Sequence, residues 1–228
     1  MKSYLDIHKE GYDVVDNFLD DDKASRLSEL CRDPHIKFFR KSKENWPPPL
    51  YSFTDISSDV IEVQNDVEIG FEFQWTDGEK LYNSQDVKGK SKLEKYPKEV
   101  INLISEYQDG VFKYLKKINY NIDDIDYLVT MPYKWPSGSS ILWHDDGQWD
   151  LGLSLYLNHS WSLNCGGELM LENGKWVYPA FNRCVIIQKK IEHRVNEILT
   201  GCKNRYSLQT FIRLSSNPKK VKNNGNLY

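Results

Sequence analysis

The chain has 228 residues, of which 39% are hydrophobic and 28% charged, with 30 basic and 33 acidic side chains and a formal net charge of -3. These values are ordinary for a globular protein, and the length fits one domain of generous size. Basic side chains do not outnumber acidic ones, so the composition does not indicate a surface that binds a phosphate backbone, and we expect no nucleic-acid partner. No run approaches the ~20 apolar residues of a membrane-spanning helix, and the charged N-terminus lacks a signal-peptide pattern.

The four cysteines lie far apart in the sequence and form no C-x-x-C pair: they are Cys31, Cys165, Cys184 and Cys202. Cysteines without such a spacing, in a chain that we expect to lack a signal peptide, are typical of free thiols in a reducing compartment. We therefore expect four free thiols and a cytoplasmic protein with no membrane contact.

The first part of the chain, residues 1–124, is predicted to mix helices with loops. Residues 12–15 favour a short strand, and an acidic cap at 20–22 precedes a helical apolar face. A longer helix is predicted from Pro97, because apolar residues then recur at helical spacing up to Leu115, with a possible kink or break at Asp109-Gly110.

Residues 36–95 hold many aromatic and charged side chains. We expect this segment either to form the substrate lid or to be a system of surface loops without catalytic residues.

Residues 125–214 are predicted to be dominated by strands. Short runs of β-branched and aromatic residues recur between turn residues, at 127–131, 139–143, 152–157, 168–171, 176–178, 184–188 and 206–212. This spacing favours a barrel or sandwich over alternating strands and helices. We expect a single domain over residues 1–214, with a supporting part at 1–124 and a core at 125–214, and a flexible polar tail at 215–228.

Two histidines and one aspartate form a candidate metal site. His144 ends a strand-like run, Asp146 follows two residues later, and His193 opens another apolar run. Two histidines and a carboxylate can occupy one face of an octahedral Fe(II). Side chains two residues apart on a strand point the same way, so His144 and Asp146 can reach one ion while Asp145 points away. The pattern alone is equally compatible with a surface loop or with a zinc hydrolase.

Arg205 lies downstream of His193 and shares a predicted strand face with Ser207. A guanidinium group beside a hydroxyl group is a good receptor for a carboxylate, because both donate hydrogen bonds to its oxygens. The alternative is a strand arginine with its head in solvent. We also expect Trp143 to pack inside the barrel and residues 147–150 to lie near the mouth of the site.

The order of these elements resembles the prolyl 4-hydroxylase-like branch of the Fe(II)- and 2-oxoglutarate-dependent oxygenase superfamily. The resemblance covers residues 133–213 and rests on the segments at 133–138, 144–146, 156–158, 161, 166–169, 193–195 and 205–208. The opening segment, residues 12–19, is also similar to the start of many such domains.

The resemblance implies a mainly β fold with flanking α-helices, namely a double-stranded β-helix or jelly roll with the metal site at its open end. By their positions in the motifs, His144, Asp146 and His193 would be the ligands of Fe(II). Because the carboxylate ligand Asp146 is present, hydroxylation is expected, whereas halogenases of the superfamily have lost this group.

The resemblance also assigns the co-substrate pocket. Arg205 would bind the distal carboxylate of 2-oxoglutarate with help from Ser207, Tyr156 would hydrogen-bond the co-substrate, and Tyr133 would line its pocket. Collagen-type prolyl hydroxylases have lysine at the position of Arg205, which weakens a collagen-type substrate but leaves the chemistry intact.

The implied activity is hydroxylation of an unactivated C–H bond, with 2-oxoglutarate and O2 consumed and succinate and CO2 released; ascorbate is a candidate further cofactor. The expected substrate is a prolyl or other residue of a peptide, or a free amino acid. The alternatives are a biosynthetic hydroxylase of another small molecule and a catalytically silent jelly roll that binds a ligand. The sequence does not indicate the oligomeric state.

Overall fold

The computed structural model describes residues 10–33, 39–41, 63–64, 67–69, 72–76, 79–83, 98–120, 122–147 and 149–214. The predicted tail at 215–228 lies outside the described residues, as does most of the predicted lid at 36–95. None of the described helices combines the length and the apolar character that crossing a membrane requires.

The elements follow the predicted division into a mixed first part and a strand-rich second part. The helices are α2 (Asp21–Arg32), α3 (Lys98–Lys117) and the short 3-10 helices η3 (Ile122–Asp124) and η4 (Leu163–Cys165). The strands of the first part are β1 (Tyr12–Val15), β2 (Phe39–Lys41), β3 (Val63–Gln64), β4 (Val67–Ile69), β5 (Glu72–Thr76) and β6 (Glu79–Asn83). Those of the second part are β7 (Ile125–Trp135), β8 (Ser140–His144), β9 (Leu151–Tyr156), β10 (Leu169–Leu171), β11 (Trp176–Val177), β12 (Cys184–Gln188), β13 (His193–Val195) and β14 (Arg205–Leu214).

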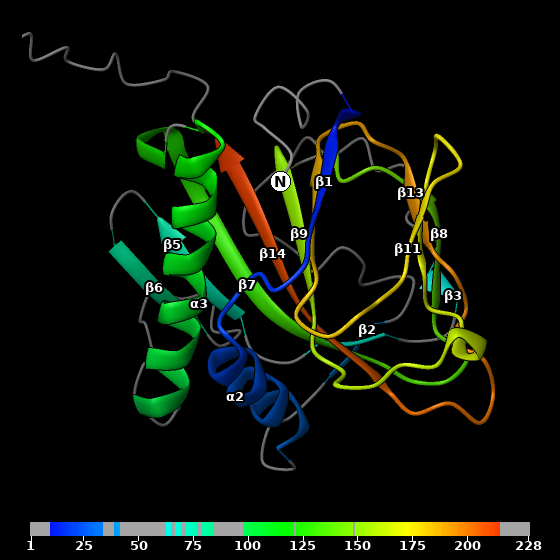
Figure 1. Ribbon diagram of the computed structural model, residues 1–228. Helices are drawn as coiled ribbons and strands as arrows, with labels where there is room; N and C mark the ends of the chain where they lie inside the picture. Colours follow the sequence, from blue (N-terminus) through cyan, green and yellow to red (C-terminus); the bar gives the residue numbers. More distant parts are fainter. Residues whose placement is uncertain are drawn as a thin grey trace, which may run out of the picture.

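From β7 to β14 the chain passes repeatedly between two antiparallel sheets. The larger sheet has the order β1-β12-β9-β14-β7-β4-β2, with β5 paired to β7 and β6 to β5, and the smaller has the order β11-β10-β13-β8-β3. The smaller sheet faces one side of the larger sheet, and α2 and α3 lie on the other side (Figure 1). This is the jelly roll with flanking helices that the resemblance implied.

Two apolar cores hold these layers together. One lies between the helices and the larger sheet, where Leu27, Ile104 and Val111 pack with strand residues such as Leu155 and Leu208. The other fills the interior between the sheets and is richer in aromatic side chains. Because alternate residues of a strand face opposite sides, each central strand of the larger sheet contributes to both cores.

The helix termini agree with the sequence, but the predicted break in α3 does not. Asp20 caps α2, since its side chain accepts a hydrogen bond from the backbone N–H of Lys23. Helix α3 runs through Asp109-Gly110 without a split. A Cβ atom at Gly110 would lie 3.0 Å from Leu19 Cδ2, so the glycine permits a close helix contact rather than ending the helix.

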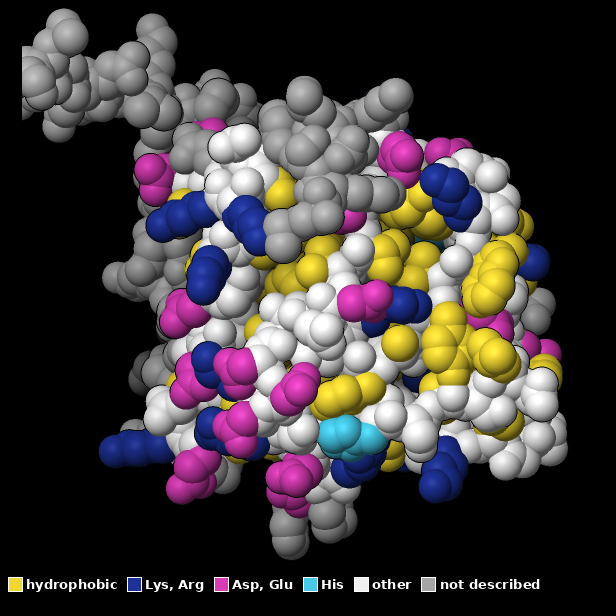
Figure 2. Space-filling view, in the orientation of Figure 1, with side chains coloured by type: hydrophobic (Ala, Val, Ile, Leu, Met, Phe, Trp, Pro, Cys, Tyr) yellow, Lys and Arg dark blue, Asp and Glu magenta, His cyan; other side chains and the backbone are white. Residues whose placement is uncertain are grey.

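The charged side chains are mixed on the face seen in Figure 2. Acidic and basic groups alternate over the part of this face formed by α2 and α3, without a large block of one sign among the residues that are coloured there. The absence of a nucleic-acid partner stays a prediction.

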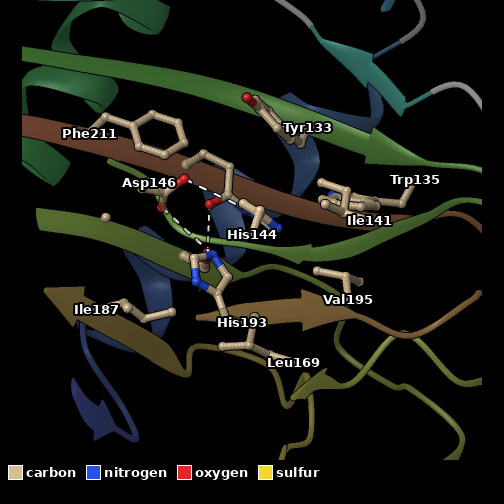
Figure 3. A pocket seen from close by; sticks show the side chains of 13 residues that line it. Tyr133, Trp135, Ile141, His144, Asp146, Leu169, Ile187, His193, Val195 and Phe211 are labelled. Carbon is tan, nitrogen blue, oxygen red and sulfur yellow. Dashed lines mark hydrogen bonds and ion pairs between the residues drawn. The ribbon is translucent and has the colours of Figure 1, made fainter. Parts of the chain in front are cut away.

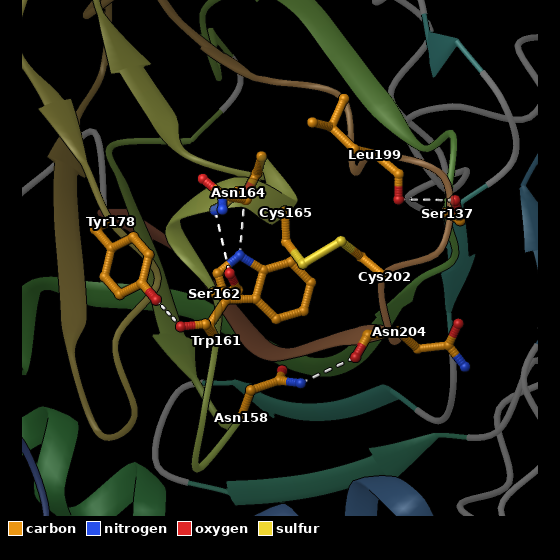
Figure 4. The surroundings of a disulfide bond; sticks show 11 residues. Ser137, Asn158, Trp161, Ser162, Asn164, Cys165, Tyr178, Leu199, Cys202 and Asn204 are labelled. Atoms are coloured by element: carbon orange, nitrogen blue, oxygen red, sulfur yellow. Dashed lines mark hydrogen bonds between the residues drawn. A yellow bond between two sulfur atoms is a disulfide. The ribbon is translucent and has the colours of Figure 1, made fainter.

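The expectation of four free thiols is wrong for one pair. Cys165 and Cys202 form a disulfide, while Cys31 and Cys184 are buried free thiols (Figure 4). The two bonded cysteines are 37 residues apart, and the backbone brings them together because the N–H of Leu199 donates to the carbonyl oxygen of Cys165. The two cysteines do not form a C-x-x-C motif, so their spacing in the sequence does not indicate that they pair. The predicted cytoplasmic location rested partly on free thiols and remains only a prediction.

The disulfide should contribute strongly to stability. The double variant Cys165→Ser, Cys202→Ser should lose about 4 kcal/mol of unfolding free energy, because the bridge closes a loop of 37 residues in the unfolded chain. Urea unfolding measures the difference. Dithiothreitol should lower the unfolding free energy of the wild type to that of the variant, and it should not change the unfolding free energy of the variant. Equal stability of the oxidised wild type and the variant would show that the bridge does not form in solution.

Candidate active site

A bulge in β8 places the two histidines of the site side by side. His193 pairs with His144, and Val195 pairs with Ile141. The two residues are two positions apart on β13, whereas their partners are three positions apart on β8, so β8 contains one extra residue. In a regular strand Ile141 and His144 would face opposite sides. The extra residue turns both toward the interior, where they line one cavity.

The same bulge explains why one aromatic residue is not in the barrel core. Trp143 is 45% exposed, so the expectation that it packs inside the barrel is wrong. It lies instead beneath the guanidinium group of Arg194, whose central carbon is 5.2 Å from the ring centroid. Trp149, by contrast, is buried and stacks against Phe211, with ring centroids 5.4 Å apart.

His144, Asp146 and His193 converge on one point at the mouth of the interior (Figure 3). The Asp146 carboxylate lies between the histidines, with Oδ1 3.9 Å from His144 Nε2 and Oδ2 3.7 Å from His193 Nε2. One potential ligand atom from each residue lies within 4.8 Å of the others. These separations exceed ordinary hydrogen-bond lengths, so the three groups face one another without bonding directly.

Backbone carbonyl groups fix the orientation of both imidazole rings. His144 Nδ1 lies 2.8 Å from the oxygen of Leu142, and His193 Nδ1 lies 2.9 Å from the oxygen of Ile191. A proton on each Nδ1 leaves the Nε2 lone pair directed at Asp146, which is the arrangement a metal-binding histidine needs. Burial, followed by the neighbouring His193, lowers the pKa of His144 and favours this neutral form.

The donor set fits a transition-metal ion. Two imidazoles and one carboxylate on one side of a point form the facial triad of non-heme iron sites, whereas a structural zinc site has four protein ligands. All three residues predicted as metal ligands are therefore together, and Asp145 turns away to accept a hydrogen bond from the N–H of Gly147.

Gly152 makes room for the carboxylate of this cluster. A Cβ atom at this position of β9 would lie 2.8 Å from Asp146 Oδ2, closer than real Cβ contacts come. Sequence reasoning did not identify Gly152 as a site residue. The available signal was a glycine within a predicted strand, since such a glycine often marks the close approach of another group.

The cavity beside the triad has a mixed lining. Its other residues come from both sheets and are Tyr133, Trp135, Ile141, Gly152, Ser154, Leu169, Ile187, Val195, Gln209 and Phe211. Most of these side chains are apolar, and the polar groups Ser154 and Gln209 come from β9 and β14. Trp135, Ser154 and Gln209 were not predicted as site residues. In a single sequence they look like ordinary strand residues, and only the pairing of β7, β14 and β9 brings them together.

Arg205 is buried behind this cavity rather than in its wall. Its guanidinium carbon lies 4.2 Å from the ring centroid of Trp135 and 5.4 Å from that of Tyr156. Nη1 donates to the carbonyl oxygen of Gly167. Among the described residues, Nε has no hydrogen-bond partner and the group forms no ion pair. Burial lowers the pKa of Arg205 to about 10, and Tyr156 and Glu168 offset only part of that effect.

The predicted co-substrate residues are thus in one region but at different depths. Tyr133 lines the cavity. Ser207 and Tyr156 are buried opposite each other on β14 and β9, directly beside Arg205. The interpretation of Arg205 as a solvent-facing strand residue is wrong, because the side chain is 1% exposed.

The disulfide fastens the backbone on both sides of Arg205. Cys165 precedes Gly167, which accepts the hydrogen bond from Arg205, and Cys202 lies just before Arg205 itself. The N–H of Gly167 donates to the carbonyl oxygen of Glu197 in the same region. The bridge therefore limits movement of the two segments that meet at the guanidinium group.

The variant Gly152→Ala should weaken metal binding while the protein stays folded. The added methyl group would push the Asp146 carboxylate away from the histidines, and the site would lose its anionic donor. Titration of the apo-protein with Fe(II) or Mn(II) under anaerobic conditions should show about a tenfold or larger loss of affinity, as for other groups that orient metal ligands. Asp145→Ala is the control and should bind like the wild type. Equal affinity in Gly152→Ala would show that Asp146 does not contribute a ligand in this position.

The chain resembles known oxygenases in sequence and in fold. Residues 130–213 match the family model described as the 2OG-Fe(II) oxygenase superfamily, and this segment contains His144, Asp146, His193 and Arg205. No curated protein matches the chain significantly.

Several solved structures share the fold at low sequence identity. A prolyl-4-hydroxylase of Pseudomonas putida is 13% identical, with a TM-score of 0.55, and the alignment covers 92% of this chain and 96% of that one. A Trichoplax adhaerens prolyl hydroxylase, solved with a hypoxia-inducible-factor peptide fragment, is 19% identical, with a TM-score of 0.55 and coverage of 92% and 86%. A 2OG-Fe(II) oxygenase family oxidoreductase of Burkholderia pseudomallei is 12% identical, with a TM-score of 0.59 and coverage of 95% and 92%.

These structural likenesses concern the fold, whereas the family model also matches the sequence that carries the histidine–aspartate–histidine cluster. The match to the 2OG-Fe(II) oxygenase superfamily is confined to residues 130–213, and with the cluster that this segment contains it supports a 2-oxoglutarate-dependent dioxygenase.

Proposed function

We propose that this dioxygenase hydroxylates an unactivated aliphatic C–H bond, with a prolyl residue of a peptide as its substrate. His144, Asp146 and His193 hold Fe(II), while Arg205 and Ser207 bind the distal carboxylate of 2-oxoglutarate. The observation that carries the proposal is that a cluster of metal donors lines the cavity, while behind it lies a buried guanidinium group that forms no ion pair with any described residue.

The protein's own part in the reaction is to hold and orient. Bonds from Nδ1 to the carbonyl oxygens of Leu142 and Ile191 keep both imidazoles facing the metal position. The three residues would hold the metal from one side only, so the co-substrate could reach it from the other side. The chemistry supplied there is the oxidative decarboxylation of 2-oxoglutarate to succinate and CO2, coupled to hydroxylation of the substrate. Ascorbate remains a proposed further cofactor, which would keep the iron reduced.

The buried cation favours a dicarboxylate co-substrate. A guanidinium group out of water needs a charged partner in close contact, and among the described residues Arg205 forms no ion pair and its Nε has no hydrogen-bond partner. The distal carboxylate of 2-oxoglutarate would supply that charge. Burial raises the pKa of Tyr156, so its hydroxyl group stays protonated and can donate to the same carboxylate. Tyr133 lines the cavity between this region and the triad.

The lining near the triad favours an aliphatic group that carries no charge. Leu169, Ile187, Val195 and Phe211 surround the histidines with apolar surface. A free amino acid would bring an ammonium and a carboxylate group, and the described lining offers no charged side chain apart from the triad to pair with them. A peptidyl residue brings neither charge. The shared fold with prolyl hydroxylases, including one solved with a peptide, makes proline the first choice.

A substrate test follows from this choice. Purified protein with Fe(II), 2-oxoglutarate and ascorbate should release succinate when given some members of a panel of proline-containing peptides, and mass spectrometry should locate one added oxygen on proline. Each peptide has a counterpart with alanine in place of proline, which should stay unmodified. Succinate release with free amino acids but with none of the peptides would contradict the peptidyl assignment and favour a small-molecule hydroxylase.

Arg205→Ala should weaken the binding of 2-oxoglutarate by about 30-fold or more, because truncating one partner of a buried charge pair costs about 2 kcal/mol or more. Calorimetry on the Mn(II)-loaded protein gives the affinity without turnover. Pyruvate has the same 2-oxo acid end but no distal carboxylate, so its affinity should not change.

The matched control is Arg194→Ala, which removes a cation from the outer face of the same barrel and should bind both ligands as the wild type does. Unchanged 2-oxoglutarate affinity in Arg205→Ala would remove Arg205 from the site.

A further inference from the structure

A chain of hydrogen bonds crosses three strands at the back of the cavity. Ser154 Oγ on β9 donates to Gln209 Oε1 at 2.5 Å, and Gln209 Nε2 donates to Ser207 Oγ at 3.1 Å, both on β14. From β7, the indole nitrogen of Trp135 also donates to Ser207 Oγ, at 3.2 Å. Gln209 and Ser207 are 7% and 0% exposed, so water has little access to this chain.

The donors in this chain determine where the Ser207 hydroxyl hydrogen can point. An indole N–H and an amide NH2 group can only donate, so Ser207 Oγ must accept from both Trp135 and Gln209. Its own hydrogen cannot be used in either bond and must be donated elsewhere. Arg205 lies two residues earlier on the same face of β14, so an anion held by the guanidinium group is within reach of this hydrogen.

The orientation of the Gln209 amide decides where the Ser207 hydrogen points. A glutamine amide can turn over and exchange its oxygen and nitrogen positions. If this amide turned, its oxygen would face Ser207 and accept the hydroxyl hydrogen, which would then be lost to the anion. Ser154 Oγ can accept as well as donate, so it can pair with the amide in either orientation. The Ser207 hydrogen reaches an anion held by Arg205 only in the observed orientation, in which Gln209 Nε2 donates to Ser207.

We propose that Gln209 is a positioning residue for the co-substrate: by donating from Nε2 to Ser207 Oγ, it keeps the Ser207 hydroxyl hydrogen directed at the carboxylate that Arg205 binds. The proposal rests on the proposed function, because it takes that carboxylate to be the distal end of 2-oxoglutarate. It adds a specificity role for Gln209, since this arrangement favours co-substrates with a second carboxylate over those with only the 2-oxo acid end.

The variant Gln209→Glu reverses the chain without a large change of shape. The ionised carboxylate that this substitution introduces cannot donate to Ser207 and instead accepts its hydrogen, whereas the protonated acid can donate again, as the amide does. Burial raises the pKa of such a carboxyl group, so the two forms should exchange between about pH 8 and about pH 6. The charged or titratable groups near this position are Arg205 on β14, Tyr133 on β7, Tyr156 on β9, His193 on β13, and His144 with Asp146 at the end of β8.

The experiment measures the affinity of 2-oxoglutarate and of pyruvate for the Mn(II)-loaded protein by calorimetry across this pH range. The ratio of the two affinities reports the contribution of the distal carboxylate to binding, because a change in protonation of the triad alters the affinity of both ligands equally. In the wild type the ratio should favour 2-oxoglutarate at every pH. In Gln209→Glu it should fall by about tenfold or more at high pH and recover toward the wild-type value at low pH. Gln209→Leu, which cannot donate to Ser207 at any pH, should lower the ratio at all pH values without recovery.

The outcomes separate the two claims. A wild-type ratio that favours 2-oxoglutarate, together with unchanged ratios in both Gln209→Glu and Gln209→Leu, would overturn the role of Gln209 and leave the proposed function standing. Equal loss of both ligands without a pH-dependent recovery would also overturn it, since that is the result of a merely structural defect. A wild type that does not prefer 2-oxoglutarate to pyruvate would contradict the proposed function itself.

Discussion

The site depends first on how β8 and β13 pair. A single extra residue in β8 allows Ile141 and His144 to face the same interior, opposite His193. Without it, a regular ladder would turn His144 outward and leave one histidine beside Asp146. The carbonyl oxygens that hold the two Nδ1 atoms belong to the same segments, two residues before each histidine. Backbone geometry thus brings the donors together before any metal binds, and the absence of a side chain at Gly152 leaves space for the carboxylate between them.

The second constraint is the burial of a cation. Arg205 is stacked on Trp135 and has no ion-pair partner among the described residues, which is costly unless a ligand supplies the missing charge. Its surroundings keep it in place in the meantime, through the carbonyl oxygen of Gly167 and through the disulfide that ties the neighbouring segments. Because this receptor is already rigid, little conformational entropy is lost when the ligand binds, and the affinity is higher for that reason. The metal donors line the cavity and this receptor lies behind it, so a ligand with a chelating end and a distal carboxylate could contact both.

Much of this could be predicted from the sequence because it depends on local patterns and short spacings. His144 and Asp146 lie two residues apart on an extended segment, and the apolar periodicity of α3 and the cap at Asp20 are local too. What could not be predicted depends on contacts between distant segments. The Cys165–Cys202 bridge, the space at Gly152 and the alignment of Ser154 with Gln209 all arise from strand pairing, which a single sequence does not specify. Trp143 was misplaced because a bulge is invisible to a rule of alternation.

The central claim is that the histidine–aspartate–histidine cluster and the buried arginine together bind Fe(II) and 2-oxoglutarate. Anaerobic titration of the Fe(II)-loaded protein with 2-oxoglutarate tests it most directly, by following the weak visible charge-transfer band of a 2-oxo acid chelated to iron. The account predicts that the band grows to saturation in the wild type and is lost when His144 or His193 is replaced by alanine. An iron-loaded wild type that shows no such band at any 2-oxoglutarate concentration would contradict the account.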